Sequence, residues 1–245
     1  EATKLGIIVA NTPTAVSGPV SDHTIGLLFA VIRYIPLLDR GVRAGEWKQA
    51  EMAARPGWHL DGKTLGLIGF GNISRLVVKK LSGFDLKVLV YDPYVDKDVI
   101  ISAGAQPEAM DNVLSRSDFV SVHCPYTKDT YHLIGERELR LMKPDTILIN
   151  TSRGPVLDEP VLIRALTEKW IAAAGLDVFE QEPPDPANPL FKLENVVVTP
   201  HTAGYADTTT PDFWRLSVET AVDLSHGRWP LSYVNPGVKP RWNLK

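Results

Sequence analysis

The sequence predicts an α/β protein with a doubly wound parallel sheet, and three observations lead to that prediction. Short apolar runs alternate with helical patterns from Leu65 onward, which is typical of strands linked by crossover helices. Runs such as TILIN (146–150) and VVVT (196–199) are continuously apolar between their end residues, as parallel strands covered on both faces are. The segment LGLIGFGNIS (65–74) places a buried strand directly before a glycine turn and a helix.

The part of the chain before this sheet is expected to hold one strand and one helix. LGIIVAN (5–11) predicts a first strand, followed by a loop that contains two prolines. A helix is expected from Ser21, with Ser21 or Asp22 as its N-cap. Pro36 is expected to break or kink this helix near Tyr34. The glycines and prolines of residues 41–60 predict irregular structure.

From Leu65 the expected elements alternate between strands and helices. The predicted strands are 65–69, 87–91, 118–123, 146–150, 172–178 and 196–199. The predicted helices are 73–82, 96–103, 111–115, 135–142, 158–169 and 208–226. Because the fold prediction depends on six separate strand candidates, it is stronger than any one motif.

Gly69 and Gly71 match the first two glycines of a dinucleotide-binding loop. The first glycine allows the tight turn, and the second lets backbone approach a pyrophosphate. The helix that follows points its first N–H groups at the phosphates. Ser74 occupies the third position of the fingerprint, where glycine or alanine is expected. Taken alone, this motif also fits an ordinary turn between a strand and a helix.

The next predicted strand, KVLVYD (87–92), ends in an acid. Asp92 lies 23 positions after Gly69, close to the separation of the carboxylate that binds a ribose 2′-hydroxyl. A carboxylate at this place favours NAD, because it would repel the 2′-phosphate of NADP. The nearest base downstream is Lys97. NAD is therefore the expected cofactor, with the start of an Asp-Pro turn as the alternative role of Asp92.

Composition limits the classes of function. The 245 residues are 44% hydrophobic and 22% charged, which is enough for a sizeable core. A net charge of −3 and a pI of about 6.1 argue against nucleic acid and anionic membranes as partners. No apolar run reaches the roughly 18 residues of a membrane span, and neither a signal peptide nor a metal site is expected. The single cysteine, Cys124, excludes an internal disulfide and favours a reducing, cytoplasmic location.

Polar side chains follow three later strands of the predicted sheet. Arg153 follows TILIN, Asp177 ends the next strand, Glu182 lies in the loop beyond, and His201 follows VVVT. Because ligands bind at the carboxyl ends of parallel strands, a site is expected at this edge. Taken singly, Arg153 also fits a surface arginine in a capping loop, and His201 a structural histidine.

Together, Arg153, Glu182 and His201 suit the reduction of a 2-oxo acid. Hydride transfer to a ketone builds negative charge on the carbonyl oxygen, and a cationic histidine donates a proton to that oxygen. A neighbouring glutamate favours the protonated imidazole and holds its orientation. An arginine clamps the substrate carboxylate and fixes the face presented to the nicotinamide.

The chain contains six motifs in a fixed order: GFGNIS, VYDP, VHCPYT, LINTSRGPVLDE, GLDVFEQEP and TPHTAG. As an ordered set they resemble the D-isomer-specific 2-hydroxyacid dehydrogenase family, which includes phosphoglycerate dehydrogenases, hydroxypyruvate and glyoxylate reductases, and D-lactate dehydrogenases. The resemblance runs from about Gly6 to Pro236. It implies a Rossmann NAD-binding domain with remnants of a flavodoxin-like substrate domain. It also implies an NAD-dependent oxidoreductase that acts on a small D-2-hydroxy or 2-oxo acid.

The resemblance implies roles for individual residues. Arg153 is expected to bind the substrate carboxylate, Glu182 to partner the catalytic histidine, and His201 to act as the acid/base. The residues expected to bind the cofactor are Gly69, Gly71, Asn72, Ile73, Asp92, Cys124, Thr151, Ser152, Arg153, Asp177, His201 and Gly204.

The resemblance further divides the chain into four segments. Residues 1–21 are expected to be a remnant of the substrate domain, and residues 22–45 an interdomain helix region that builds a homodimer. Residues 46–205 are expected to form the NAD-binding domain, and residues 206–245 a helix and tail that return to the substrate domain. Because the chain begins at Glu1 without methionine, an upstream segment is expected. The resemblance implies that this segment is a separate substrate domain of roughly a hundred residues. Two other interpretations stay open: a non-catalytic NAD(H)-responsive interaction protein of the corepressor type, and a fragment without activity.

Overall fold

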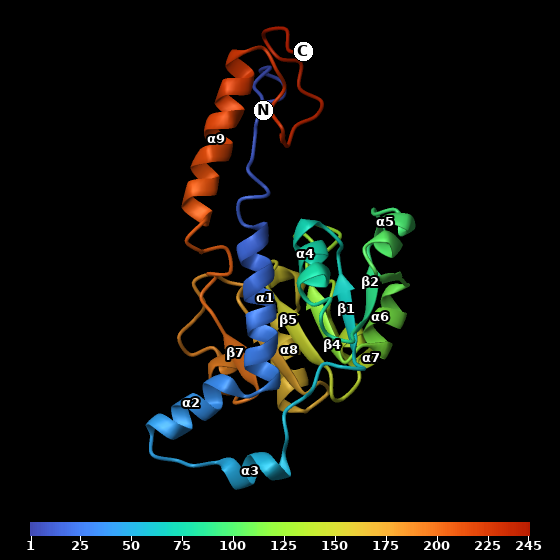
Figure 1. Cartoon of the computed structure of the whole chain (residues 1–245), viewed down its shortest axis with the longest axis vertical. Coiled ribbons are helices and arrows are strands. Elements are labelled where there is room, and N and C mark those ends of the chain that lie inside the picture. The colour runs from blue at the N-terminus through green and yellow to red at the C-terminus, as the bar shows by residue number, and fades with distance from the viewer. The chain divides into compact units, whose positions relative to one another are not determined.

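The computed structural model describes all 245 residues, which form two compact units (Figure 1). The smaller unit comprises Glu1–Pro19 and Gly204–Lys245, and the larger one comprises Val20–Ala203. The long helix α9 (Thr209–Ser225) belongs to the smaller unit. The larger unit contains the sheet.

The sheet has seven parallel strands in the order β3-β2-β1-β4-β5-β6-β7, which confirms the predicted doubly wound α/β fold. The chain adds β2 and β3 on one side of β1 and β4 to β7 on the other, so the switch point lies between β1 and β4. Ligands of such sheets bind at this kind of switch point. The strands are β1 (Thr64–Ile68), β2 (Lys87–Tyr91), β3 (Gln106–Pro107), β4 (Phe119–Val122), β5 (Ile147–Asn150), β6 (Ala173–Leu176) and β7 (Val196–Val198).

Two apolar clusters cover the two faces of the sheet. One cluster joins the sheet to α1 (Ser17–Ile32), α4 (Asn72–Lys80) and α5 (Lys97–Ser102). The other joins it to α6 (Met110–Arg116), α7 (Glu136–Leu141) and α8 (Glu159–Thr167). β4, β5 and β6 are buried along their whole length, because helices cover them on both faces.

The predicted strand over residues 5–11 is wrong. Residues Leu5, Ile7 and Val9 are 45%, 46% and 38% exposed, and the only pairing in this run is a single antiparallel bridge from Ala10 to Tyr233. Residues 2–6 form turns instead. The apolar run has β propensity, but a strand also needs a neighbour that pairs along its length, and here the pairing is limited to the bridge around Ala10 and Tyr233.

The helix predicted from Ser21 begins earlier, because α1 starts at Ser17 and includes Pro19 in its first turn. Proline is tolerated there, since the first N–H groups of a helix have no acceptor inside it. The predicted break is confirmed: α1 ends at Ile32, and Tyr34 takes a left-handed φ of 54°. The irregular structure expected over 41–60 is wrong in part, because this region contains the end of α2 (Ile35–Arg43) and all of α3 (Gln49–Ala54).

Candidate active site

The turn between β1 and α4 has the shape that a dinucleotide needs. Gly69 has a φ of 95°, and a Cβ there would lie 2.7 Å from the backbone nitrogen of Cys124. Only glycine fits this combination of left-handed backbone and close approach. At Gly71, by contrast, an added Cβ would meet open space, directly before the exposed N-terminus of α4. The loop therefore leaves room for a phosphate at a helix end whose N–H groups attract anions.

Ser74, which departs from the fingerprint, is fully buried in the first turn of α4. Its hydroxyl donates a hydrogen bond of 2.7 Å to the carbonyl oxygen of Gly69. The serine thus ties the helix to the glycine turn. Asn72 and Ile73, the two other predicted loop residues, occupy the first two positions of α4.

Asp92 lies at the end of β2, and its carboxylate holds two loops. One oxygen accepts the backbone N–H of Phe70 at 2.7 Å. The other accepts the N–H groups of Tyr94 at 2.9 Å and Val95 at 3.2 Å. The side chain is therefore fixed beside the glycine turn, where the sequence predicts a ribose-binding acid.

The loop after β4 brings Cys124 against the glycine turn. Burial raises the pKa of the Cys124 thiol to about 11 and lowers the pKa of the neighbouring His123 to about 4. The ring of His123 contacts Ser121 through Nε2 at 2.9 Å, whereas its buried Nδ1 has no hydrogen-bond partner. Sequence reasoning did not single out His123, because it lies inside the predicted strand 118–123 and not after it.

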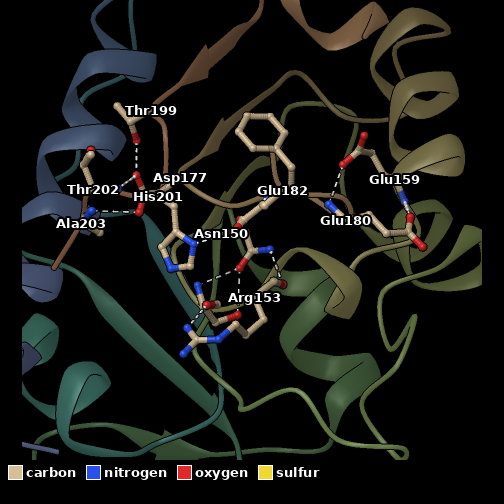
Figure 2. Close-up of polar contacts among 12 residues, drawn as sticks. Asn150, Arg153, Glu159, Asp177, Glu180, Glu182, Thr199, His201, Thr202 and Ala203 are labelled. Atoms are coloured by element: carbon tan, nitrogen blue, oxygen red, sulfur yellow. Dashed lines mark hydrogen bonds and ion pairs between the residues drawn. The ribbon is translucent and has the colours of Figure 1, made fainter. Parts of the chain in front are cut away.

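His201 and Glu182 form a close pair (Figure 2). Nδ1 of His201 lies 2.6 Å from Oε2 of Glu182, and because a carboxylate accepts, the imidazole nitrogen donates. The other oxygen of Glu182 accepts the N–H of Phe179 at 3.0 Å. Both side chains of the pair are partly exposed. His201 itself has a left-handed φ of 54°, a strained backbone of the kind found at functional sites.

Asp177 is fully buried at the end of β6 and fixes the turn that carries His201 (Figure 2). Its carboxylate accepts the hydroxyl of Thr199 at 2.5 Å and the N–H groups of Thr202 and Ala203 at 2.9 Å each. The carbonyl oxygen of Asp177 also accepts the N–H of His201 at 2.7 Å. A buried carboxylate thus stands at the base of the candidate acid/base.

Arg153 follows β5, at the same edge of the sheet as the carboxyl ends of β6 and β7. Its exposed guanidinium donates to the carbonyl oxygen of Ser152 at 2.6 Å, and no hydrogen bond joins it to the His201–Glu182 pair. The backbone of Arg153 is held by Asn150, whose side-chain amide donates to its carbonyl oxygen at 3.0 Å. Asn150 is buried and was missed by sequence reasoning, although an amide ending the apolar run TILIN was the available signal.

The remaining predicted cofactor residues lie in different surroundings. Ser152 donates to Asn150 through both its N–H and its hydroxyl. Thr151 is buried, with its hydroxyl 2.8 Å from that of Thr24 on α1. Gly204 belongs to the smaller unit, where its carbonyl oxygen accepts the hydroxyl of Thr209. The predicted roles of these residues stay predictions.

Comparison with known proteins identifies the family. Residues 25–203 match the protein family described as D-isomer specific 2-hydroxyacid dehydrogenase, NAD binding domain. The glyoxylate reductase of Thermococcus litoralis is 44% identical over 242 residues, which cover 97% of this chain and 73% of that protein. This chain belongs to the D-isomer specific 2-hydroxyacid dehydrogenase family. The glyoxylate reductase of Korarchaeum cryptofilum is also similar, with 43% identity over 97% of this chain and 72% of that protein.

Solved structures agree with this assignment. The apo form of D-mandelate dehydrogenase from Rhodotorula graminis superposes with a TM-score of 0.89 at 31% identity, covering 97% of this chain and 71% of that one. D-lactate dehydrogenase with NAD⁺ from Lactobacillus jensenii gives 0.83 at 29% identity, covering 95% and 73%. The predicted family and cofactor are thus confirmed: this 2-hydroxyacid dehydrogenase is an NAD-dependent enzyme. None of its helices is long and apolar enough to cross a membrane.

Proposed function

We propose that this dehydrogenase interconverts a small D-2-hydroxy acid and its 2-oxo acid, with His201 as acid/base, Glu182 as its partner and Arg153 as the substrate-carboxylate ligand. The observation that carries the proposal is the 2.6 Å contact between Nδ1 of His201 and Glu182. This contact stands at the sheet edge to which Arg153 and the glycine turn also belong.

The glycine turn fits NAD, because Gly71 leaves open space before the N-terminus of α4. When bound, NADH supplies the hydride that reduces the carbonyl carbon. We assign the pyrophosphate to Gly69, Gly71, Asn72 and Ile73, and the adenosine ribose to Asp92. The residues proposed to line the nicotinamide half are Cys124, Thr151, Ser152, Arg153, Asp177, His201 and Gly204.

Glu182 and His201 handle the proton. The carboxylate of Glu182 accepts the Nδ1 proton, so it fixes the ring orientation and stabilises the imidazolium. Nε2 of His201 then carries the proton that passes to the carbonyl oxygen as that oxygen becomes negative. In the reverse direction, Nε2 takes the hydroxyl proton of the hydroxy acid.

Arg153 orients the substrate. Its guanidinium is exposed, and its planar fork matches a carboxylate in a bidentate pair. A clamped carboxylate leaves the 2-oxo carbon with one face toward the hydride donor. Because the relatives named above are glyoxylate reductases, glyoxylate is the first substrate to test.

The test is NADH oxidation by the purified protein with glyoxylate, hydroxypyruvate, pyruvate and phosphohydroxypyruvate. We expect turnover that Arg153→Ala and His201→Ala each lower by about 100-fold or more, while NADH still binds. His59→Ala, which alters an exposed histidine, is the matched control. Wild-type turnover in either active-site variant would refute the assigned roles.

We further propose that the protein is a cytoplasmic homodimer joined through residues 22–45. Two apolar side chains of α2, Ile35 and Val42, are more than half exposed, and Trp47 beyond it is more exposed still. Exposed apolar side chains close together favour burial against a partner. Light scattering coupled to size exclusion tests this: Val42→Asp should give a monomer if α2 is the interface.

A further inference from the structure

A second histidine, His132, ties together the loops that follow three neighbouring strands. It lies in the loop after β4, and its Nε2 is 2.7 Å from Oε1 of Glu180 in the loop after β6. Its Nδ1 is 3.5 Å from Oδ2 of Asp158, the residue that caps α8 after β5. The ring of Tyr131 stacks on the imidazole, with the ring centres 3.9 Å apart. The imidazole therefore bridges two carboxylates from different loops.

The backbone of His132 is fixed as firmly as its side chain. Its φ is 50°, and its N–H donates to the carbonyl oxygen of Pro155 at 2.9 Å. Two residues later, Ile134 forms a parallel bridge with Leu157. A left-handed φ is uncommon in residues other than glycine and persists where the surroundings enforce it.

Negative charge gathers at the place where His132 lies. Glu180 and Glu159 bind each other reciprocally: the N–H of Glu180 donates to Glu159 at 2.9 Å, and the N–H of Glu159 donates to Glu180 at 3.3 Å. Asp158 precedes Glu159 in the chain. These three carboxylates lie close together, and the imidazole of His132 stands between two of them, those of Glu180 and Asp158.

The junction holds the same turn that carries Glu182. Within residues 179–182, Glu182 reaches back to the N–H of Phe179 and outward to His201, whereas Glu180 reaches Glu159 and His132. Figure 2 shows Glu180 meeting Glu159 on one side of this turn, away from the contact of Glu182 with His201. One turn thus presents two glutamates to two different histidines.

The loop of Arg153 is fitted to this turn as well. A Cβ at Gly154 would lie 1.7 Å from the carbonyl oxygen of Phe179, so the two backbones touch directly. A shift of the turn would therefore displace Glu182 and the segment that follows Arg153 together.

We propose that His132 is a positioning residue, whose bridge to Glu180 and Asp158 holds Glu182 where it meets His201. This inference rests on the proposed function, since it assigns Glu182 and His201 the acid/base role. It predicts that removing the bridge lowers the rate of proton transfer without weakening cofactor binding.

The first test reads the His201–Glu182 contact directly. Nitrogen-15 NMR of labelled histidines in the 245-residue chain reports whether Nδ1 of His201 carries a hydrogen-bonded proton. His132→Asn is the test variant, because asparagine tolerates a left-handed φ but is too short to span both carboxylates. Glu182→Gln supplies the reference spectrum without the carboxylate, and His59→Asn, at an exposed histidine, is the matched control. We expect the His201 signals of His132→Asn to shift toward those of Glu182→Gln.

The second test is a double-mutant cycle in kcat. His132→Asn should lower kcat by about 10–100-fold and leave the NADH Kd within about twofold of wild type. In the Glu182→Gln background the same change should cost less than about threefold, because the partner through which His132 acts is already lost. If His132 had a merely structural role, His132→Asn would lower kcat by the same factor in the wild-type and the Glu182→Gln backgrounds.

The outcomes separate the two proposals. Wild-type kcat and His201 signals in Glu182→Gln would overturn the proposed function itself. An impaired Glu182→Gln beside a His132→Asn variant with wild-type His201 signals would overturn the role of His132 alone. If His132→Asn does not fold, Glu180→Gln is the second variant, since it keeps the acceptor for Glu159 but removes the charge facing His132. We expect a smaller loss of kcat from it, and wild-type behaviour would refute the inference.

Discussion

Replacing Asp177 with asparagine tests how the chain holds the turn that presents His201. The carboxylate accepts three hydrogen bonds, from the hydroxyl of Thr199 and from the N–H groups of Thr202 and Ala203. Asparagine has one acceptor oxygen, and in either orientation its NH₂ group faces a backbone N–H. With the oxygen toward Thr199 and Thr202, the N–H of Ala203 loses its acceptor in a buried place.

The cost follows from these contacts. An unsatisfied buried N–H costs about 1–3 kcal/mol, and the two remaining bonds lose their charge assistance. The free energy of unfolding should therefore fall by about 2–4 kcal/mol. For a unit of roughly 150–250 residues this corresponds to a Tm lower by about 4–16 °C.

Differential scanning calorimetry of Asp177→Asn against wild type measures this shift. Asp129→Asn makes the same chemical change at an exposed loop position and should leave Tm within about 1 °C. If Asp177→Asn also melted within 1 °C of wild type, the three hydrogen bonds would not hold the turn as argued.

Three further predictions follow from the site. Gly69→Ala should lower the free energy of unfolding by about 2–4 kcal/mol and abolish NADH binding. Gly71→Ala, whose Cβ meets open space, should leave stability unchanged and weaken the affinity for NADH by about tenfold or more. Equal Tm values for the two variants would contradict this prediction. Because burial raises the pKa of Cys124 to about 11, only about a thousandth of the thiol is ionised at pH 8, so mass spectrometry should find it unalkylated after a treatment that modifies free cysteine. Burial lowers the pKa of His123 to about 4, so between about pH 6.5 and pH 4 this histidine is protonated in the unfolded chain but neutral in the folded chain. The free energy of unfolding should therefore fall by about 2 kcal/mol from pH 7 to pH 5. Urea unfolding at both pH values should show a smaller fall in His123→Asn.

Sequence patterns located the sheet because its strands are defined by burial. A strand such as Ile147–Asn150 is covered on both faces, so its first three residues are apolar, and its ends fell within one residue of the prediction. The run 5–11 has the same character but forms no strand, because pairing depends on a distant partner that the run itself does not specify. The two-residue strand Gln106–Pro107 was too short to leave any pattern.

The candidate site shows the same division. The spacing of Arg153, Glu182 and His201 after their strands was readable, because strand ends fix where a sheet binds ligands. The contacts around them were harder to predict. Asn150 bonds the backbone of Arg153 only three positions away, so the amide at the end of TILIN was a usable local signal. His132 contacts Glu180 across 48 positions, and no local pattern encodes such a contact.

Asp92 has a consequence for anyone who wishes to change the nucleotide preference. The acid proposed to choose NAD is also the clasp between two loops, through the N–H groups of Phe70, Tyr94 and Val95. Exchanging it for a small apolar residue would make room for a 2′-phosphate, but would also leave these three N–H groups without an acceptor. If Asp92 has the proposed role, one side chain serves both coenzyme choice and loop order. A redesign toward NADP has to restore acceptors for those donors before it adds a base for the phosphate.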